Sequence, residues 1–176
     1  MNIRNNIGRA AGIAVVVICW LSWAAMASAS PAVAGPELHG CVFLTSNGHY
    51  LTAVGGGGLT TDAIHSDATQ IGSWEKFDAV NLFADRFAYR TFNGHYLTAV
   101  GNGGRTTDVV RTAATQVGTS ETFIAASLGS SVFGIETPDQ VHFLTAVGGG
   151  GLTTNVIHSD ATRIQGWEKF TITCGH

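Results

Sequence analysis

The stretch GHYLTAVGGGGLTTDAIHSDATQIGSWEKF, residues Gly48–Phe77, decides the fold because the chain carries it three times. The second copy is Gly94–Phe123, GHYLTAVGNGGRTTDVVRTAATQVGTSETF, and the third is Val141–Phe170, VHFLTAVGGGGLTTNVIHSDATRIQGWEKF. The copies start 46 and then 47 residues apart. A threefold repeat of this length indicates one supersecondary unit used three times. We therefore predict three related lobes, at approximately residues 41–86, 87–130 and 131–176.

Each unit has the pattern of four short strands. An apolar run is followed in two copies by Asn-Gly (Asn47-Gly48 and Asn93-Gly94), a dipeptide typical of two-residue hairpin turns. The third copy has a longer turn at Pro138–Gln140. The HYLTAV or HFLTAV strand comes next and ends at a glycine run. A short LTT or RTT strand, a long loop and a closing strand that begins EKF or ETF complete the unit.

Three such units with hardly any helical periodicity predict an all-β fold, either a barrel or a trefoil. A three-bladed propeller is the alternative, but propellers typically have four or more blades. We predict a β-trefoil formed by residues 35–176 as one domain. We expect its core to contain the large apolar residues that are identical in all three copies, because truncating a buried Phe costs about 3–5 kcal/mol: Leu51, Leu97, Leu144, Phe77, Phe123 and Phe170.

The first 34 residues have the organisation of a secretory signal peptide. Arg4 and Arg9 give a basic start, an apolar run covers residues 10–25, and Ala-x-Ala sequences end at residues 29 and 34, the two candidate cleavage points. A retained membrane anchor is the alternative, although the run is short for a span of about 20 residues. We expect a secreted protein that has no membrane partner after cleavage.

The remaining chain is acidic, with seven Lys and Arg against twelve Asp and Glu, a net charge of −5. It has no basic run, which argues against a nucleic acid or an anionic membrane as partner. We expect a monomer. Cleavage would remove Cys19 and leave Cys41 and Cys174, and export favours a disulfide between them over free thiols or a metal site. In a trefoil the first and last strands are neighbours, so this bridge would lock the seam of the barrel.

The repeated GxYLTAV, the glycine-rich hairpin and the terminal E-x-F strand resemble fascin-like β-trefoils. The Trp-Glu before the last Phe makes the chain similar to secreted trefoil carbohydrate-binding modules that recognise β-glucans, and this resemblance covers nearly all of residues 35–176. It implies that a Trp and a Glu near the start of each last strand form a sugar site. Those residues are Trp74-Glu75 and Trp167-Glu168, whereas the middle copy has Ser120-Glu121.

Comparison of the three copies selects the same positions. His, Asp and Trp are present in copies one and three and are replaced together in copy two, and nothing nearby in copy two grows to compensate: His65, Asp67 and Trp74; His158, Asp160 and Trp167; Arg111, Ala113 and Ser120. A core Trp replaced by Ser would leave a large cavity, so we expect both tryptophans at or near the surface. Shared ancestry of copies one and three is the alternative explanation.

An exposed indole and a carboxylate suit a sugar, because the C–H face of a pyranose stacks on the ring and the carboxylate accepts hydroxyl hydrogen bonds. We expect the His and Asp residues in the long loop to form the wall of the same pocket. Glu121 persists without a Trp, which leaves its role open between binding and structure. Several weak sites on one rigid body would gain avidity on a polymer.

No catalytic centre emerges. Consecutive residues such as His65-Ser66-Asp67 cannot form a nucleophile–base–orienter arrangement, and the glycine runs lack the GK[ST] of a phosphate loop. The repeat-related histidines of the strands, His49, His95 and His142, are expected to bond to their neighbours rather than to a metal. We therefore predict a non-catalytic, lectin-like protein without cofactor or metal that binds a polysaccharide such as a β-glucan. A structural or protein-binding trefoil that cross-links partners is the alternative.

Overall fold

A computed structural model describes residues 35–175, and the predicted signal peptide lies outside this range. The described residues form twelve strands, four from each repeat, as predicted. The strands are β1 (Glu37–Leu44), β2 (Tyr50–Ala53), β3 (Ile64–Ala68), β4 (Phe77–Phe83), β5 (Arg86–Arg90), β6 (Tyr96–Ala99), β7 (Val110–Ala114), β8 (Phe123–Gly129), β9 (Val132–Glu136), β10 (Phe143–Ala146), β11 (Ile157–Ala161) and β12 (Lys169–Thr173). Short 3-10 turns cover Val54–Gly56 (η1), Val100–Asn102 (η2), Thr119–Glu121 (η3) and Val147–Gly149 (η4).

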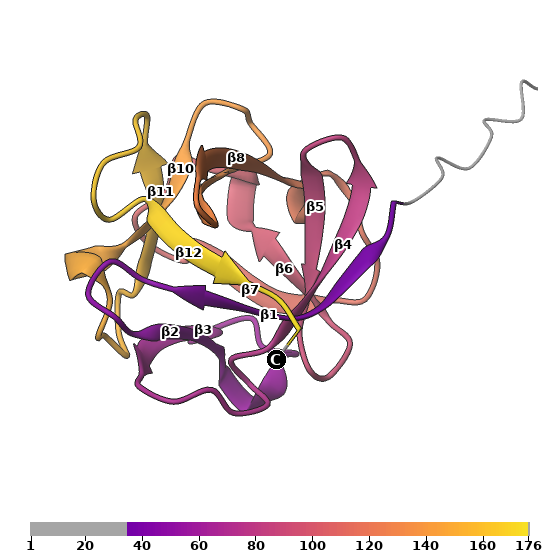
Figure 1. The fold of residues 1–176 in the computed structure, drawn as a ribbon, viewed down its shortest axis with the longest axis horizontal. Coiled ribbons are helices and arrows are strands. Elements are labelled where there is room, and N and C mark those ends of the chain that lie inside the picture. Colours follow the sequence, from indigo (N-terminus) through magenta and orange to yellow (C-terminus); the bar gives the residue numbers. More distant parts are fainter. Residues whose placement is uncertain (1–34, 176) are drawn as a thin grey trace, which may run out of the picture. The chain divides into compact units, whose positions relative to one another are not determined.

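Six strands close into a barrel and three hairpins are attached to it (Figure 1). Antiparallel pairing runs β1–β4–β5–β8–β9–β12, and β12 pairs with β1 to close the ring. The other six strands form the hairpins β2–β3, β6–β7 and β10–β11, one per repeat. A six-stranded barrel with three hairpins is the β-trefoil, so the fold prediction is confirmed and the propeller alternative is wrong.

The core consists of the residues that the three copies share. Phe77, Phe123 and Phe170 are at most 2% exposed, and the three repeat-related leucines are 4–7% exposed. Phe43 joins the centre and makes edge-to-face contacts with Phe77 and Tyr89, with ring centroids 5.4 and 5.0 Å apart. Such aromatic pairs stabilise a core beyond the area that they bury.

The predicted LTT strand is wrong, because these residues pair with the next repeat instead of forming a strand of their own hairpin. The Gly58 N–H donates to the Thr112 carbonyl at 2.8 Å, and the Thr112 N–H donates to the Leu59 carbonyl at 2.9 Å. Asp62 then takes a positive φ of 49° and turns the chain into β3, which lies where a loop was predicted. The other two junctions repeat these bonds, so each hairpin is held by its neighbour.

One glycine of each hairpin is required by close packing between repeats. A Cβ added to Gly57, whose φ is 103°, would lie 2.1 Å from the Oγ1 of Thr91 in the next repeat. Gly103 and Gly150 meet the equivalent threonines at 2.4 and 2.3 Å. No other residue fits at these distances, which explains why this glycine is present in all three runs.

The seam of the barrel is closed by a disulfide between Cys41 and Cys174, as predicted. Cys41 is fully buried beside β12, which pairs with β1 at Val42–Thr173. Among residues 35–175, the structure has no helix with the length and apolar character needed to cross a membrane.

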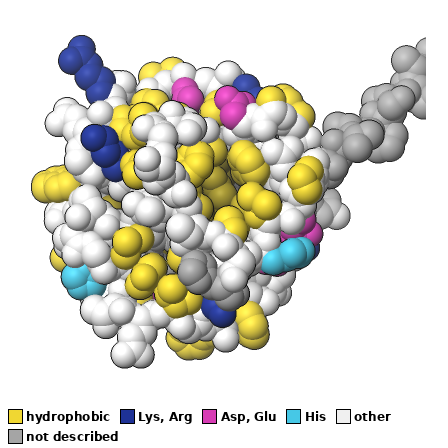
Figure 2. Space-filling model, in the orientation of Figure 1, with side chains coloured by type: hydrophobic (Ala, Val, Ile, Leu, Met, Phe, Trp, Pro, Cys, Tyr) yellow, Lys and Arg dark blue, Asp and Glu magenta, His cyan; other side chains and the backbone are white. Residues whose placement is uncertain are grey.

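Figure 2 shows hydrophobic side chains gathered near the middle of one face of the molecule, with few charged groups around them. A hollow of about 180 Å³ has an apolar lining that includes Leu38, Phe87, Phe133 and Ile172. These residues come from β1, β5, β9 and β12, all strands of the barrel.

Candidate functional site

The two tryptophans of the repeats lie at the surface. Trp74 is 48% exposed and Trp167 is 51% exposed, in agreement with the comparison of the copies. Their main chains are nevertheless fixed, because the carbonyls of Trp74 and Trp167 accept hydrogen bonds from the N–H groups of Ala53 and Ala146, each at 2.9 Å. Each indole is therefore presented to solvent from an anchored loop.

The glycine at the second position of the third glycine run lies beside the indole of Trp167. A Cβ added to Gly149 would lie 3.5 Å from both Cδ1 and Nε1 of Trp167. Beside this ring a depression of about 280 Å³ is lined by Gln165, Gly166, Trp167 and Glu168. The third repeat thus combines an exposed aromatic surface with a small polar depression.

The second repeat uses the same space differently. Asn102 takes the place of Gly149, and its Oδ1 accepts a hydrogen bond from the Ser120 hydroxyl at 2.8 Å. The expectation that nothing grows to compensate for the missing Trp is therefore wrong, since an Asn–Ser pair replaces a Gly–Trp pair. The second and third copies therefore differ at two positions that contact each other, the second glycine of the run and the Trp position.

The three glutamates close the loop that precedes the last strand of each repeat. Glu75 is 8% exposed, and its two oxygens accept hydrogen bonds from the Thr52 hydroxyl and the Gly72 N–H, both at 2.7 Å. Glu168 and Glu121 make the same two bonds in their repeats, at 2.8–2.9 Å. Loop closure explains why Glu121 persists without a Trp. Glu168 also lines the depression beside Trp167.

The histidines and aspartates predicted in a loop lie on strands instead, and this prediction is corrected. His65 and Asp67 belong to β3, and His158 and Asp160 to β11. His65 pairs across the ladder with Thr52, whose hydroxyl binds a glutamate, so the two side chains share one face.

The ring of each histidine is engaged at the tip of its own hairpin. Nε2 of His65 lies 3.1 Å from Oδ1 of Asp62, and Nε2 of His158 lies 2.9 Å from Oδ1 of Asn155. In the second repeat Arg111 replaces the histidine and donates two bonds to Asp108 at 2.7 and 3.1 Å. Hydrogen bonds from Arg111 lower the pKa of Asp108.

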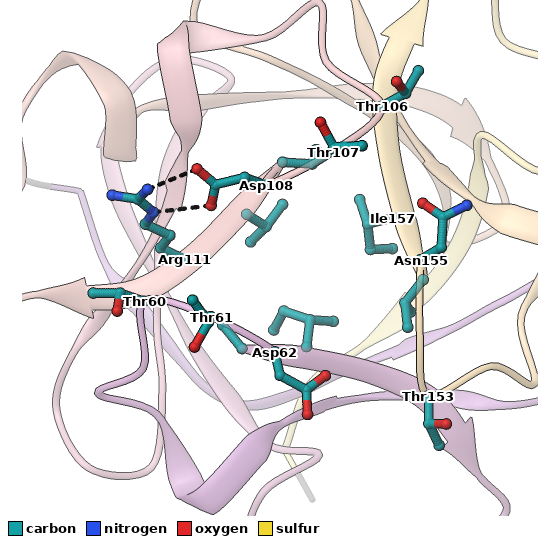
Figure 3. Close-up of a pocket in the computed structure, with 15 residues that line it drawn as sticks. Thr60, Thr61, Asp62, Thr106, Thr107, Asp108, Arg111, Thr153, Asn155 and Ile157 are labelled. Atoms are coloured by element: carbon teal, nitrogen blue, oxygen red, sulfur yellow. Dashed lines mark hydrogen bonds and ion pairs between the residues drawn. The ribbon is translucent and has the colours of Figure 1, made fainter.

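These tips surround a second depression, of about 370 Å³, to which all three repeats contribute (Figure 3). Threonine hydroxyls such as Thr61 and Thr107 alternate with the tip residues, and Ile157 extends towards the centre. Neither tryptophan lines this depression. The predicted residues are therefore not gathered in one pocket: the tryptophans form the indole surfaces, the two histidines contact the hairpin tips, and the exposed Asp67 and Asp160 lie further along β3 and β11.

The consecutive residues His65, Ser66 and Asp67 do not form a nucleophile and base pair. Ser66 is fully buried and its hydroxyl bonds to the Leu152 carbonyl at 3.3 Å, whereas His65 points outward to Asp62. Nδ1 of His49 contacts Oδ1 of Asn47 at 3.0 Å and Nδ1 of His142 contacts Oδ2 of Asp139 at 2.6 Å, as expected, whereas the buried Nδ1 of His95 has no hydrogen-bond partner among residues 35–175.

One group of residues outside the predicted site has the composition of a metal site. Glu37, His39 and Asp78 bring potential ligand atoms within 4.8 Å of one another. Arg90, however, donates to both carboxylates and provides the positive charge there. Burial raises the pKa of Asp78, but hydrogen bonds from Arg90, Gly40 and His39 outweigh it and hold the pKa below its usual value.

Comparisons with known proteins agree on the fold. No family model matches the chain. No curated protein matches it either. Among solved structures, the designed threefold-symmetric protein ThreeFoil is similar with a TM-score of 0.64 and 12% identity, covering 77% of this chain and 96% of that one. The Rhizoctonia solani agglutinin is similar with a TM-score of 0.63 and 14% identity, covering 78% and 96%. A Polyporus squamosus lectin is similar with a TM-score of 0.59 and 16% identity, covering 80% and 50%. At these identities the likeness establishes the β-trefoil fold.

Proposed function

We propose that this chain is a secreted, monomeric and non-catalytic protein that binds a polysaccharide such as a β-glucan. Trp74 and Trp167 are the binding surfaces. The single observation that carries the proposal is the exposure of these two indoles, 48% and 51%, on loops whose main chains are anchored in the fold. A half-exposed Trp on an anchored loop is suited to recognition, because Trp is enriched among the residues that dominate binding interfaces.

The chemistry of the indole surface suits a neutral sugar. A pyranose presents polarised C–H groups that stack on the negative face of the ring. At Trp167 the adjoining depression adds the Glu168 carboxylate, which already accepts two hydrogen bonds and retains a free lone pair on each oxygen for sugar hydroxyls. We assign Glu75 and Glu121 to closure of their loops rather than to sugar binding. Two separate sites on one rigid body gain avidity on a polymer.

Structures that share the fold support the proposal. Two of the similar proteins are named an agglutinin and a lectin, and the Polyporus squamosus lectin is described as bound to Neu5Aca2-6Galb1-4GlcNAc. The β-glucan itself rests on the sequence resemblance. Its identity and linkage are therefore what the experiment has to establish.

Affinity electrophoresis of residues 35–176 in gels that contain a soluble β-glucan tests the proposal. We expect the wild-type protein to be retarded and the double variant Trp74→Ala/Trp167→Ala to migrate as in a glucan-free gel. The thermal midpoint of the double variant should stay close to that of the wild type, because both rings are half exposed. Leu128→Ala, which truncates another exposed apolar residue, is the control and should leave retardation unchanged. Undiminished retardation of the double variant would contradict the proposal.

A protein-binding role is the second candidate, favoured by a specific feature of the surface. Phe83 and Leu128, at the ends of the hairpins β4–β5 and β8–β9, are 55% and 46% exposed. Exposed apolar groups of this kind are enriched at protein interfaces. If no glucan or other glycan on a broad array is bound by the wild-type protein, this candidate takes precedence.

A further inference from the structure

Phe92 is the most exposed of the large hydrophobic residues in the described part of the chain, at 64%. It occupies the turn between β5 and β6, immediately before Asn93. The equivalent residues in the other two repeats are Ser46 and Pro138, because each directly follows the buried threonine of its turn. An aromatic ring at this position is thus specific to the junction of the first and second repeats and is not required by the scaffold.

A groove of about 580 Å³ lies beside this ring. Its lining includes Lys76, Asp78, Arg90, Thr91, Phe92, Tyr96 and Thr115. The volume lies within the range of about 300–1,000 Å³ that is usual for small-molecule sites. One exposed aromatic ring, a second aromatic side chain and several hydrogen-bonding groups are the combination that a sugar requires.

Arg90 and Asp78 of the groove pair with each other, whereas Lys76, which also lines the groove, has no ion pair among residues 35–175. Arg90 donates to Asp78 Oδ2 at 2.9 Å and also to Glu37, so its positive charge is already paired. Paired groups of this kind retain free lone pairs and N–H donors for hydroxyls but give no net attraction to a charged ligand. The groove therefore offers hydrogen-bond donors and acceptors to the hydroxyls of a polyol, and Lys76 adds one positive charge at its wall.

The relation between the repeats links the groove to the surface proposed for Trp74. At the junction of the third and first repeats, a Cβ at Gly149 would lie 2.9 Å from the Ser46 hydroxyl and 3.5 Å from the Trp167 ring. The Ser46 and Trp167 side chains therefore lie on either side of Gly149. The threefold relation makes Phe92 and Trp74 the corresponding pair, while the atoms nearest a Cβ at Gly56 itself belong to the Asn93 side chain, at 3.0–3.1 Å.

Direct contacts of the first junction agree with this placement. The Asn93 amide donates to the carbonyls of Gly55 and Gly57, and the Asn93 N–H donates to that of Gly56, the counterpart of Gly149. Lys76, two residues after Trp74, lines the groove.

The turn that carries Phe92 differs from its counterparts in a second way. Thr91 Oγ1 and His95 Nδ1 are buried and have no hydrogen-bond partner among the described residues. In the first repeat the same two atoms bond to the Asn47 side chain at 3.1 and 3.0 Å. The amides of Asn47 and Asn93 both donate to the neighbouring hairpin, so the two turns differ in the contacts of the Asn side-chain oxygen. Unpaired buried polar atoms are uncommon and frequently accompany adaptation to a function.

We propose that Phe92 and its groove form an additional sugar subsite that extends the Trp74 surface. The junction of the first and second repeats then holds a longer segment of a neutral polysaccharide than the Trp167 surface, where Ser46 replaces the second ring. The proposal rests on the proposed function and adds a preference for chain length, carried by one of the two surfaces.

Binding of short and long soluble β-glucan oligosaccharides by the Trp167→Ala variant tests this proposal, because that variant retains only the Trp74 surface. Adding Phe92→Ser, which introduces the residue of the equivalent position, should raise the Kd for long oligosaccharides about tenfold, the usual effect of losing an aromatic stacking contact. The Kd for short ones should change less than twofold. Leu128→Ser in the same background is the control and should change neither Kd.

The outcomes separate the two proposals. Equal weakening of short and long ligands, or no change with long ones, overturns the Phe92 subsite while leaving the proposed function intact. Absence of glucan binding by the wild-type protein overturns both. A thermal midpoint of Phe92→Ser close to that of its parent shows that a lost affinity reflects a lost contact, and we expect this result because the ring is 64% exposed.

Discussion

Truncation of Glu121 separates structural from binding roles of the repeated glutamates, because its repeat has no Trp. The carboxylate is 8% exposed and accepts hydrogen bonds from the Thr98 hydroxyl at 2.8 Å and the Gly118 N–H at 2.9 Å. In Glu121→Ala both donors lose a charged partner, and each such bond is worth about 1.5–3 kcal/mol. Because Gly118 lies near the surface, where water replaces part of the loss, we expect the free energy of unfolding to fall by about 3 kcal/mol.

For a domain of this size, that loss corresponds to a decrease in the thermal midpoint of about 10 °C. Urea denaturation of residues 35–176 measures it, with Glu121→Gln as the matched variant that retains one acceptor oxygen and should lose less. Glucan retardation should be unchanged in both variants. A loss of stability below about 0.5 kcal/mol, typical of a surface substitution, would refute the assignment of Glu121 to loop closure. Loss of glucan binding with intact stability would refute it as well.

Three further predictions concern stability. Replacing Cys41 and Cys174 with Ala should lower the free energy of unfolding by about 5 kcal/mol in the chain-entropy account, since the bridge joins residues separated by 133 positions; equal denaturation curves of the two proteins would contradict this. Phe123→Ala should cost about 3–5 kcal/mol, because the ring is fully buried, and a cost below 1 kcal/mol would be inconsistent with the core described. Burial raises the pKa of Asp78, but hydrogen bonds, chiefly from Arg90, lower it in the folded protein below its ordinary value of 3.8. The stabilisation by Asp78 should therefore be complete above pH 3.8 and decline as the pH falls below that value. The free energies of unfolding of the wild type and Asp78→Asn, measured by denaturation across this range, should converge at low pH. A difference between them that does not change with pH would contradict this prediction.

Much of the fold was predictable because the chain contains three versions of one unit. Residues identical in all three copies, such as Phe77 and Leu51, had to be those that the scaffold needs, and both are buried. The LTT strand was predicted wrongly because local pattern does not show that Leu59 pairs with Thr112 of the next repeat. Backbone hydrogen bonds between repeats depend on tertiary structure.

The candidate site was predictable in part for the same reason. The loss of Trp in the second copy indicated exposure, which the structure confirms for Trp74 and Trp167. The aligned copies show that Asn102 stands where the third copy has Gly149. Only the structure shows that Gly149 lies beside the Trp167 ring and that Asn102 bonds to Ser120, the residue that replaces this Trp. Phe92 was missed because the turn of the third copy is longer, which obscures the alignment at that position.

The most direct test of the central claim uses the fluorescence of the indoles themselves. Two of the four tryptophans, Trp20 and Trp23, precede residue 35, so a chain of residues 35–176 reports only on Trp74 and Trp167. The variants Trp74→Ala and Trp167→Ala each retain one tryptophan. Saturation with a β-glucan should shift the emission of each variant to shorter wavelength, because the stacked sugar replaces water on the ring. Glucan binding that leaves the emission of both variants unchanged would show that the saccharide is held elsewhere.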